Sequence, residues 1–131
     1  MPPPQPTRLG LVDGKLNTCP ESPNCVSSES LDAQHQVAPL PFSGSAGEAL
    51  KRVIDVVGAM PRTQLISQKN NYLHFECRSR LFRFVDDLEF YVDQERHVIQ
   101  VRSASRVGYS DLGVNRKRVE KVREALLAEG L

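Results

Sequence analysis

Four arginines, three serines and an asparagine crowd the segment RSASRVGYSDLGVNRKR, from Arg102 to Arg118. A guanidinium group offers a planar pair of donors that matches the oxygens of a carboxylate or a phosphate. The segment holds five basic residues against one acidic residue, Asp111, in a chain whose formal net charge is only +1. The chemistry to expect here is the binding of a small anionic or polar ligand, or of an acidic group on a partner.

The adjacent aspartates Asp86 and Asp87 lie at the start of an alternating stretch, so we expect them on opposite faces of a strand. They therefore do not form a paired-carboxylate acid/base site by themselves. Either one could reach an arginine of the later segment. The full set of candidate ligand-binding residues is Arg102, Ser103, Ser105, Arg106, Asp111, Asn115 and Arg118, together with Asp86 and Asp87.

Other interpretations of this segment stay open. Asp111 could pair with Arg102 or Arg106 and hold the loop shut as a structural network. A hydrolase or transferase could use Ser105 or Cys25 as nucleophile, but it would need a base beside that residue. The chain shows no G-x-S-x-G elbow, P-loop, H-E-x-x-H or dinucleotide motif. Whether it is an enzyme is uncertain; we favour a non-catalytic role without a cofactor, and a structural or assembly protein is a further alternative.

The stretch NTCPESPNCVSS carries two of the three cysteines, Cys19 and Cys25, separated by five residues. They could be two thiols, a small disulfide loop or, with less support, a metal site, because structural zinc usually takes four ligands in tighter pairs. The histidines form no motif, and His74 and His97 are expected to be exposed on strands. We predict a thiol or disulfide pair and no metal.

The elements that must position these residues can be placed from periodicity. In 46–59 apolar residues recur at helical spacing behind a capping box formed by Ser45 and Glu48. Four alternating or β-prone stretches follow at 63–69, 72–78, 88–93 and 97–103. A second helix is expected to begin near Asn115, as N-cap, and to end near Gly130.

The expected fold is α+β: an antiparallel four-stranded sheet with two helices packed on one face, preceded by a long extended N-terminal arm. Eight of the nine prolines lie in the first 44 residues, which is why an arm is expected there. We assign residues 1–16 to a partly flexible arm and 17–131 to a single α+β domain. In this fold the segment 102–118 joins the last strand to the last helix, and the free N–H groups of a helix start favour anions.

Composition limits the function classes. Aromatic residues make up 6% of the chain and there is no tryptophan, so few side chains are available to stack on bases, and nucleic acid is not expected as a partner. No apolar run approaches the length of a membrane span. The N-terminal residues lack the pattern of a signal peptide. We expect a cytoplasmic protein, with an envelope location as the alternative if a leader was removed.

Three stretches, CPESPNCVSS, LFRFVDDLEF and VRSASRVGYSDLGVNRKRVE, resemble the hallmark blocks of a bacterial and plastid family catalogued as domain of unknown function number 1499. The resemblance spans about residues 17–127. It implies no catalytic residues, because it carries no established activity. Relatives with a leader, a lipid attachment or membrane helices are implied as well, and this chain shows no such segment.

Overall fold

The computed structural model describes residues 9–80, 84–108 and 112–130. Two helices and eight strands are assigned within these ranges. The strands are β1 (Leu11–Val12), β2 (Lys15–Leu16), β3 (Cys25–Ser27), β4 (Leu40–Pro41), β5 (Thr63–Lys69), β6 (Tyr72–Arg78), β7 (Val85–Asp93) and β8 (Val98–Ser105), and the helices are α1 (Ala46–Gly58) and α2 (Val114–Ala128). The α+β class is therefore confirmed.

The main sheet has six strands rather than the expected four. Its antiparallel order is β3-β8-β7-β6-β5, and the outer edge of β8 pairs with β3 at one end and with β4 at the other. Residues expected to form an extended arm thus supply two short edge strands. They were not recognised because strands of two or three residues are too short to show alternation.

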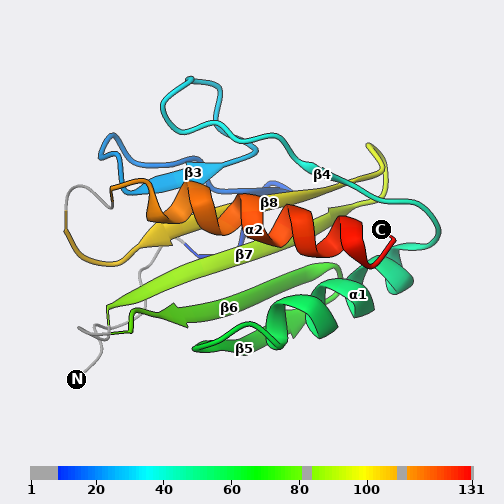
Figure 1. Cartoon of the computed structure of the whole chain (residues 1–131). Helices are drawn as coiled ribbons and strands as arrows, with labels where there is room; N and C mark the ends of the chain where they lie inside the picture. The colour runs from blue at the N-terminus through cyan, green and yellow to red at the C-terminus, as the bar shows by residue number, and fades with distance from the viewer. Residues whose placement is uncertain (1–8, 81–83, 109–111, 131) are drawn as a thin grey trace.

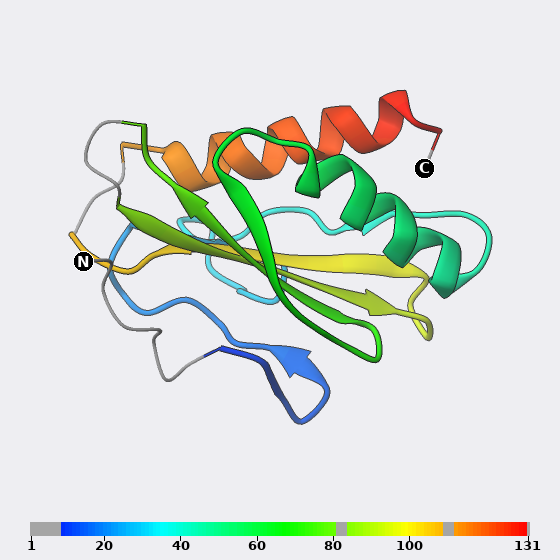
Figure 2. The same ribbon diagram turned by 90° about the horizontal axis from the view of Figure 1, so that it is seen from below.

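Both helices cover the same face of this sheet, and the small β1–β2 hairpin lies against the opposite face (Figures 1 and 2). The core lies between the helices and the sheet. Alternate strand residues such as Leu73, Phe75, Leu88, Phe90 and Val101 are completely buried there. This alternation is the period of two on which the sheet prediction rested.

The start of α1 is confirmed in detail. The N–H of Glu48 donates to Oγ of the N-cap Ser45 over 3.1 Å, and the Ser45 hydroxyl lies 3.1 Å from the Glu48 carboxylate. The start of α2 differs from the prediction. Its N-cap is Gly113, in a left-handed conformation with φ of 80°, and Asn115 lies inside the helix. Asn115 is instead completely buried, where its amide joins loops to the sheet.

The face of the sheet opposite the helices is also covered, which the sequence analysis did not predict. Strand β7 is buried at residues of both faces, including Asp87 and Glu89. Leu16 of the hairpin is only 3% exposed, and Gly10 donates its N–H to the Glu89 carboxylate over 2.9 Å. The hairpin therefore closes over a layer of charged side chains. The expected flexibility of residues 1–8 lies outside the described residues.

Candidate functional site

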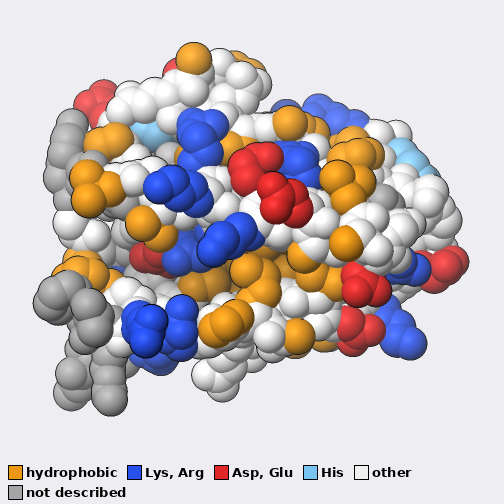
Figure 3. Space-filling view, viewed as in Figure 1, with side chains coloured by type: hydrophobic (Ala, Val, Ile, Leu, Met, Phe, Trp, Pro, Cys, Tyr) orange, Lys and Arg blue, Asp and Glu red, His pale blue; other side chains and the backbone are white. Residues whose placement is uncertain are grey.

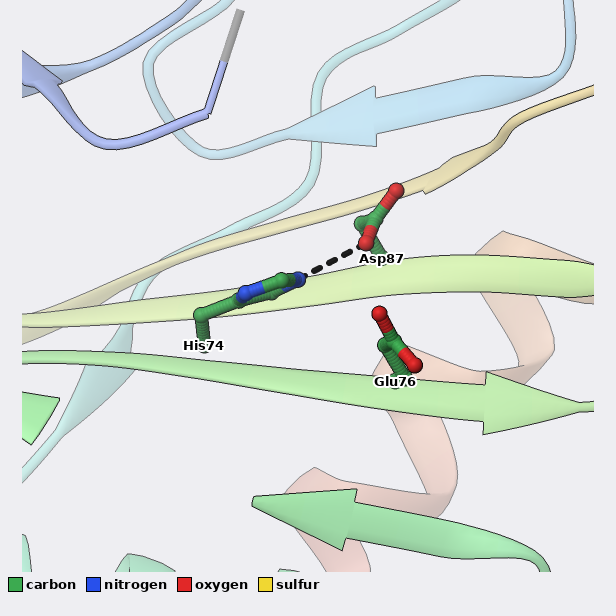
Figure 4. Close-up of side chains that lie close together, drawn as sticks. All are labelled: His74, Glu76 and Asp87. Atoms are coloured by element: carbon green, nitrogen blue, oxygen red, sulfur yellow. Dashed lines mark hydrogen bonds and ion pairs between the residues drawn. The ribbon is translucent and has the colours of Figure 1, made fainter. Parts of the chain in front are cut away.

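Polar side chains of β6, β7 and β8 meet on the hairpin side of the sheet. Cross-strand pairing places His74 opposite Glu89 and Glu76 opposite Asp87. Figure 4 shows the close approach of His74, Glu76 and Asp87, with His74 Nε2 2.7 Å from Asp87 Oδ1. The side chains of these three residues are 4%, 11% and 2% exposed. His74 is thus buried, and the expectation that it would be exposed is wrong.

Arg106 sits at the centre of this group. Its Nε and Nη2 donate to the two oxygens of Asp87 over 2.8 Å each, and Nη2 also donates to Glu76 over 2.6 Å. Burial alone would raise the pKa of Asp87, but hydrogen bonds from Arg106 and His74 outweigh it and hold that pKa below its usual value. The two carboxylates raise the pKa of Arg106 in turn. This bidentate pair is buried, oriented and charged.

The donor set of His74, Glu76 and Asp87 could by its chemistry hold a metal ion, since one ligand atom from each lies within 4.8 Å of the others. The Arg106 guanidinium, however, already contacts both carboxylates. It supplies the positive charge that a cation would bring, and a metal would have to displace it. We therefore assign the described group as an ion-pair network of the fold.

A second buried ion pair lies further along the same face. Arg102 Nη1 donates to Glu89 Oε1 over 3.2 Å, and Glu89 Oε2 accepts from the Tyr72 hydroxyl over 2.5 Å. Burial and the Glu89 charge raise the pKa of Tyr72 well above its usual value, so the phenol stays a donor. Arg102 Nε is buried with no partner among the described residues. Such a buried, unsatisfied donor is costly.

The opposite, helix-covered face holds a separate polar group around the start of α2. Arg118 Nη1 lies 2.8 Å from Asp86 Oδ2 and donates to Asn115 Oδ1 over 2.8 Å and to Ser103 Oγ over 3.1 Å. The Asn115 amide donates to Ser105 Oγ over 2.9 Å and to the backbone carbonyl of Asn24 over 3.1 Å. These bonds connect the end of β8, the CPESPNC loop and the start of α2.

The predicted ligand-binding residues accordingly divide between two faces of the sheet. Arg102, Arg106 and Asp87 belong to the hairpin side, whereas Ser103, Ser105, Asn115, Arg118 and Asp86 belong to the helix side. The aspartates do point to opposite faces, and each reaches an arginine of the later segment. Asp111 lies outside the described residues.

Two hollows in the surface lie elsewhere. One, of about 750 Å³, runs between α1 and α2 and is lined by residues that include Lys51, Arg52 and Glu129. The other, of about 370 Å³, lies beside the β1–β2 hairpin and is lined by residues that include Glu29 and Tyr91. Neither of these two is lined by a predicted ligand-binding residue.

The CPESPNC loop is closed by a disulfide between Cys19 and Cys25, with the two Cα atoms 5.6 Å apart. Of the alternatives that the sequence left open, the structure contains the disulfide. Cys25 is 1% exposed and holds no free thiol, so it is not a nucleophile in this structure. The loop also packs on His35, whose ring nitrogens bond the Ser22 carbonyl and the Asp32 carboxylate. Burial alone would lower the pKa of His35, but these bonds raise it overall.

Replacing both disulfide cysteines by serine is expected to lower the free energy of unfolding by about 2 kcal/mol, from the entropy of closing so short a loop. Urea unfolding followed by circular dichroism measures it. Adding a reductant should lower the free energy of unfolding of the unaltered protein by a similar amount. It should not change the free energy of unfolding of the Cys19→Ser/Cys25→Ser variant. Equal stability of the two proteins without reductant would show that the bond does not stabilise the loop.

The sequence analysis missed several residues of the hairpin-side network, namely Tyr72, His74, Glu76 and Glu89. A signal was present: their positions alternate along β6 and β7 with the apolar ones, and nearly all are ionisable. A solvent-facing strand usually mixes in uncharged polar residues. Complementary charges on three consecutive strands at matching positions could have indicated a second buried face.

A family model described as "Protein of unknown function (DUF1499)" matches residues 15–126. A comparison with curated proteins found no match. The described helices include none that is both long and apolar enough to cross a membrane. The matched range contains the disulfide loop, the whole six-stranded sheet and nearly all of α2. The chain therefore belongs to the family of proteins of unknown function DUF1499.

Proposed function

We propose that the protein is a non-catalytic module that binds a small anionic or polar ligand, or an acidic group of a partner, at the start of α2. The observation that carries this proposal is the geometry of Arg118. Its Nη1 is held by Asp86, Ser103 and Asn115, which fixes the plane of the guanidinium. Within the described residues, Nε and Nη2 have no acceptor and are not shut off from solvent. The Arg118 side chain is 15% exposed, and in this proposal its oriented Nε and Nη2 meet the ligand.

The other candidate residues take supporting roles in this proposal. Arg102 and Arg106 are committed to the buried carboxylates of Glu89 and Asp87, so they stabilise the strand that leads into the loop. Ser105 and Asn115 orient Arg118 through their hydrogen bonds. The start of α2 adds the positive end of the helix dipole beside Arg118.

The proposal is tested by calorimetric titration with phosphate, sulfate and acetate at low ionic strength. We expect weak binding by the unaltered protein and a loss of about tenfold or more in Arg118→Met, since a charge-assisted pair of hydrogen bonds is removed. Arg116→Met is the matched control, because Arg116 is exposed on the same helix and bonds the backbone carbonyls of Gln34 and Gln36.

Equal binding by Arg118→Met and the unaltered protein would refute the site. No binding of any of the three anions would favour the structural or assembly role instead, in which both polar networks serve only the fold.

The nucleophile alternative rests on Ser105 alone, because Cys25 is in a disulfide. The Ser105 hydroxyl accepts from the Asn115 amide, and an amide is not a general base. Among the described residues no histidine, aspartate or lysine is hydrogen-bonded to Ser105 Oγ. This geometry favours binding over hydrolysis or group transfer.

We also propose an oxidising compartment, in place of the expected cytoplasm, as the site of action. The support is the Cys19–Cys25 disulfide, since such bonds rarely persist in a reducing cytosol.

A further inference from the structure

Large hydrophobic side chains are exposed at one end of the molecule, where β7 begins, β8 ends and α2 begins. The exposed fractions are 51% for Phe84, 42% for Val107, 88% for Leu112 and 45% for Val114. Phe84 precedes β7, and the other three lie between β8 and the first residue of α2; the four are among the nine large hydrophobic residues that are exposed in the described chain. Exposed apolar clusters of this kind mark interaction surfaces.

Backbone and side-chain bonds hold these loops side by side. The N–H of Arg106 donates to the Val85 carbonyl over 3.2 Å, which places Val107 near Phe84. Asn24 donates to the Gly108 carbonyl over 2.6 Å, and Asn115 of α2 donates to the Asn24 carbonyl over 3.1 Å. The helix start is thereby tied to the loop after β8. Figure 1 shows the same end of the sheet and of α2 meeting on the left.

Basic side chains surround this apolar group. Arg62, Arg80 and Lys117 are exposed, and the side chain of Arg78 is 38% exposed and paired with Glu76 over 3.3 Å. The N–H of Arg78 donates to the Arg62 carbonyl over 2.9 Å, which brings the start of β5 to the same end. Among the described residues of 78–84 and 106–118 there is no acidic residue. Figure 3 shows hydrophobic and basic side chains interspersed at this end.

The backbone at Leu112 is strained in a way that keeps this side chain outward. Leu112 has φ of 55°, in the left-handed region, and Gly113 follows with φ of 80°. A bulky residue with positive φ is uncommon because its Cβ is crowded there. Such strain is retained where a position serves a function. The leucine at this position is 88% exposed, which is why it belongs to the apolar group.

We infer that this end, defined as the docking end by Phe84, Val107, Leu112, Val114 and the basic residues Arg62, Arg78, Arg80 and Lys117, binds the surface of an anionic lipid bilayer. The inference rests on the proposed function, because the headgroup phosphate is then the anion that Arg118 meets. The apolar side chains come from the connections before β7 and before α2, and a bilayer conforms to such projections without a matching shape. Basic residues beside them are attracted to anionic lipid.

The test is sedimentation with vesicles of phosphatidylcholine alone or with one third phosphatidylglycerol, using the full chain. We expect binding to the anionic vesicles that weakens as salt rises. Leu112→Ser should lower the partition coefficient about tenfold, from the loss of one buried leucine. Arg62→Gln and Arg80→Gln should each lower it about fivefold. Leu31→Ser and Lys51→Gln, which alter exposed residues of other regions, are matched controls expected to change nothing.

Equal sedimentation with both vesicle types, or none, overturns the inference. If phosphate still binds in an Arg118-dependent manner, the proposed function survives that result. Anionic vesicle binding that Leu112→Ser leaves unchanged also overturns the inference, because charge alone then accounts for it. Binding to polyglutamate but not to vesicles would identify an acidic protein as the partner and refute the bilayer. Circular dichroism of each variant verifies its fold.

Discussion

The variant Arg106→Met is expected to lose about 3–5 kcal/mol of unfolding free energy at neutral pH, which is typical for removing one partner of a buried ion pair. The Arg106 side chain is 4% exposed, and it is bonded to both oxygens of Asp87 and to Glu76. Methionine fills similar space but leaves two buried carboxylates facing each other without a cation. Urea unfolding measures the loss.

The pH dependence separates this electrostatic effect from a packing defect. The pKa of Asp87 is held below its usual value of 3.8, so its contribution to stability is present above that pH and is lost as pH falls through the folded pKa. Without Arg106 one of the two hydrogen bonds that lower the pKa of Asp87 is lost, so burial weighs more and the pKa of Asp87 rises; protonation then relieves the variant as pH falls. The deficit should therefore shrink between neutral pH and pH about 3.

The exposed Arg80→Met serves as the control, with an expected change below about 0.5 kcal/mol. A deficit in Arg106→Met that stays constant across this pH range would point to lost packing. A deficit under about 1 kcal/mol would mean that water reaches the pair and screens it.

The helix-covered half of the fold was accessible from sequence because its signals are local. Alternating Leu73, Phe75 and Cys77 gave strand β6 with its true bounds, and Ser45 and Glu48 marked the start of α1. These patterns depend only on the period of the element and on its nearest neighbours in the chain. Such patterns predict which residues face a core. They carry no information on whether the opposite face of the sheet is covered as well.

The missing half depended on pairings distant in sequence. Strands β3 and β4 form because each pairs with the outer edge of β8. Their own few residues carry no pattern that predicts a strand. The burial of His74 and Glu89 follows from a hairpin more than fifty residues earlier in the chain. The sequence also left open which carboxylate each arginine would bind. Arg102 and Arg106, which are four residues apart, bind Glu89 and Asp87 of β7.

The charged layer also explains why the segment 102–118 looks so rich in functional groups. Three of its four arginines pair with buried carboxylates, and Arg116 bonds backbone carbonyls of Gln34 and Gln36. Arg118 is also held in place by Asn115 and Ser103, and its side chain keeps a 15% exposed fraction. Most of the unusual composition is therefore required by a sheet that is buried on both faces, and the proposed binding function is assigned to Arg118 and the start of α2.

Glu89→Leu is the second variant with a large expected effect, again about 3–5 kcal/mol. Glu89 is completely buried and accepts hydrogen bonds from Gly10, Tyr72 and Arg102. Leucine removes all three acceptor contacts at once. It leaves the buried Arg102 charge, whose Nε already has no partner among the described residues, without compensation. It also removes the acceptor of the Gly10 N–H, which holds the segment before β1 against the sheet.

The double variant Glu89→Leu/Arg102→Met distinguishes the ion pair from the hairpin anchor. Replacing both charges by apolar groups of similar size removes the uncompensated charge, so the double variant should regain most of the stability lost in Glu89→Leu. Protease sensitivity of residues 9–16 should nevertheless rise in both variants, because the Gly10 contact is lost in each. If the double variant is as unstable as Glu89→Leu, the cost arises from the hairpin and the Tyr72 hydroxyl, and Arg102 does not depend on Glu89 for its burial.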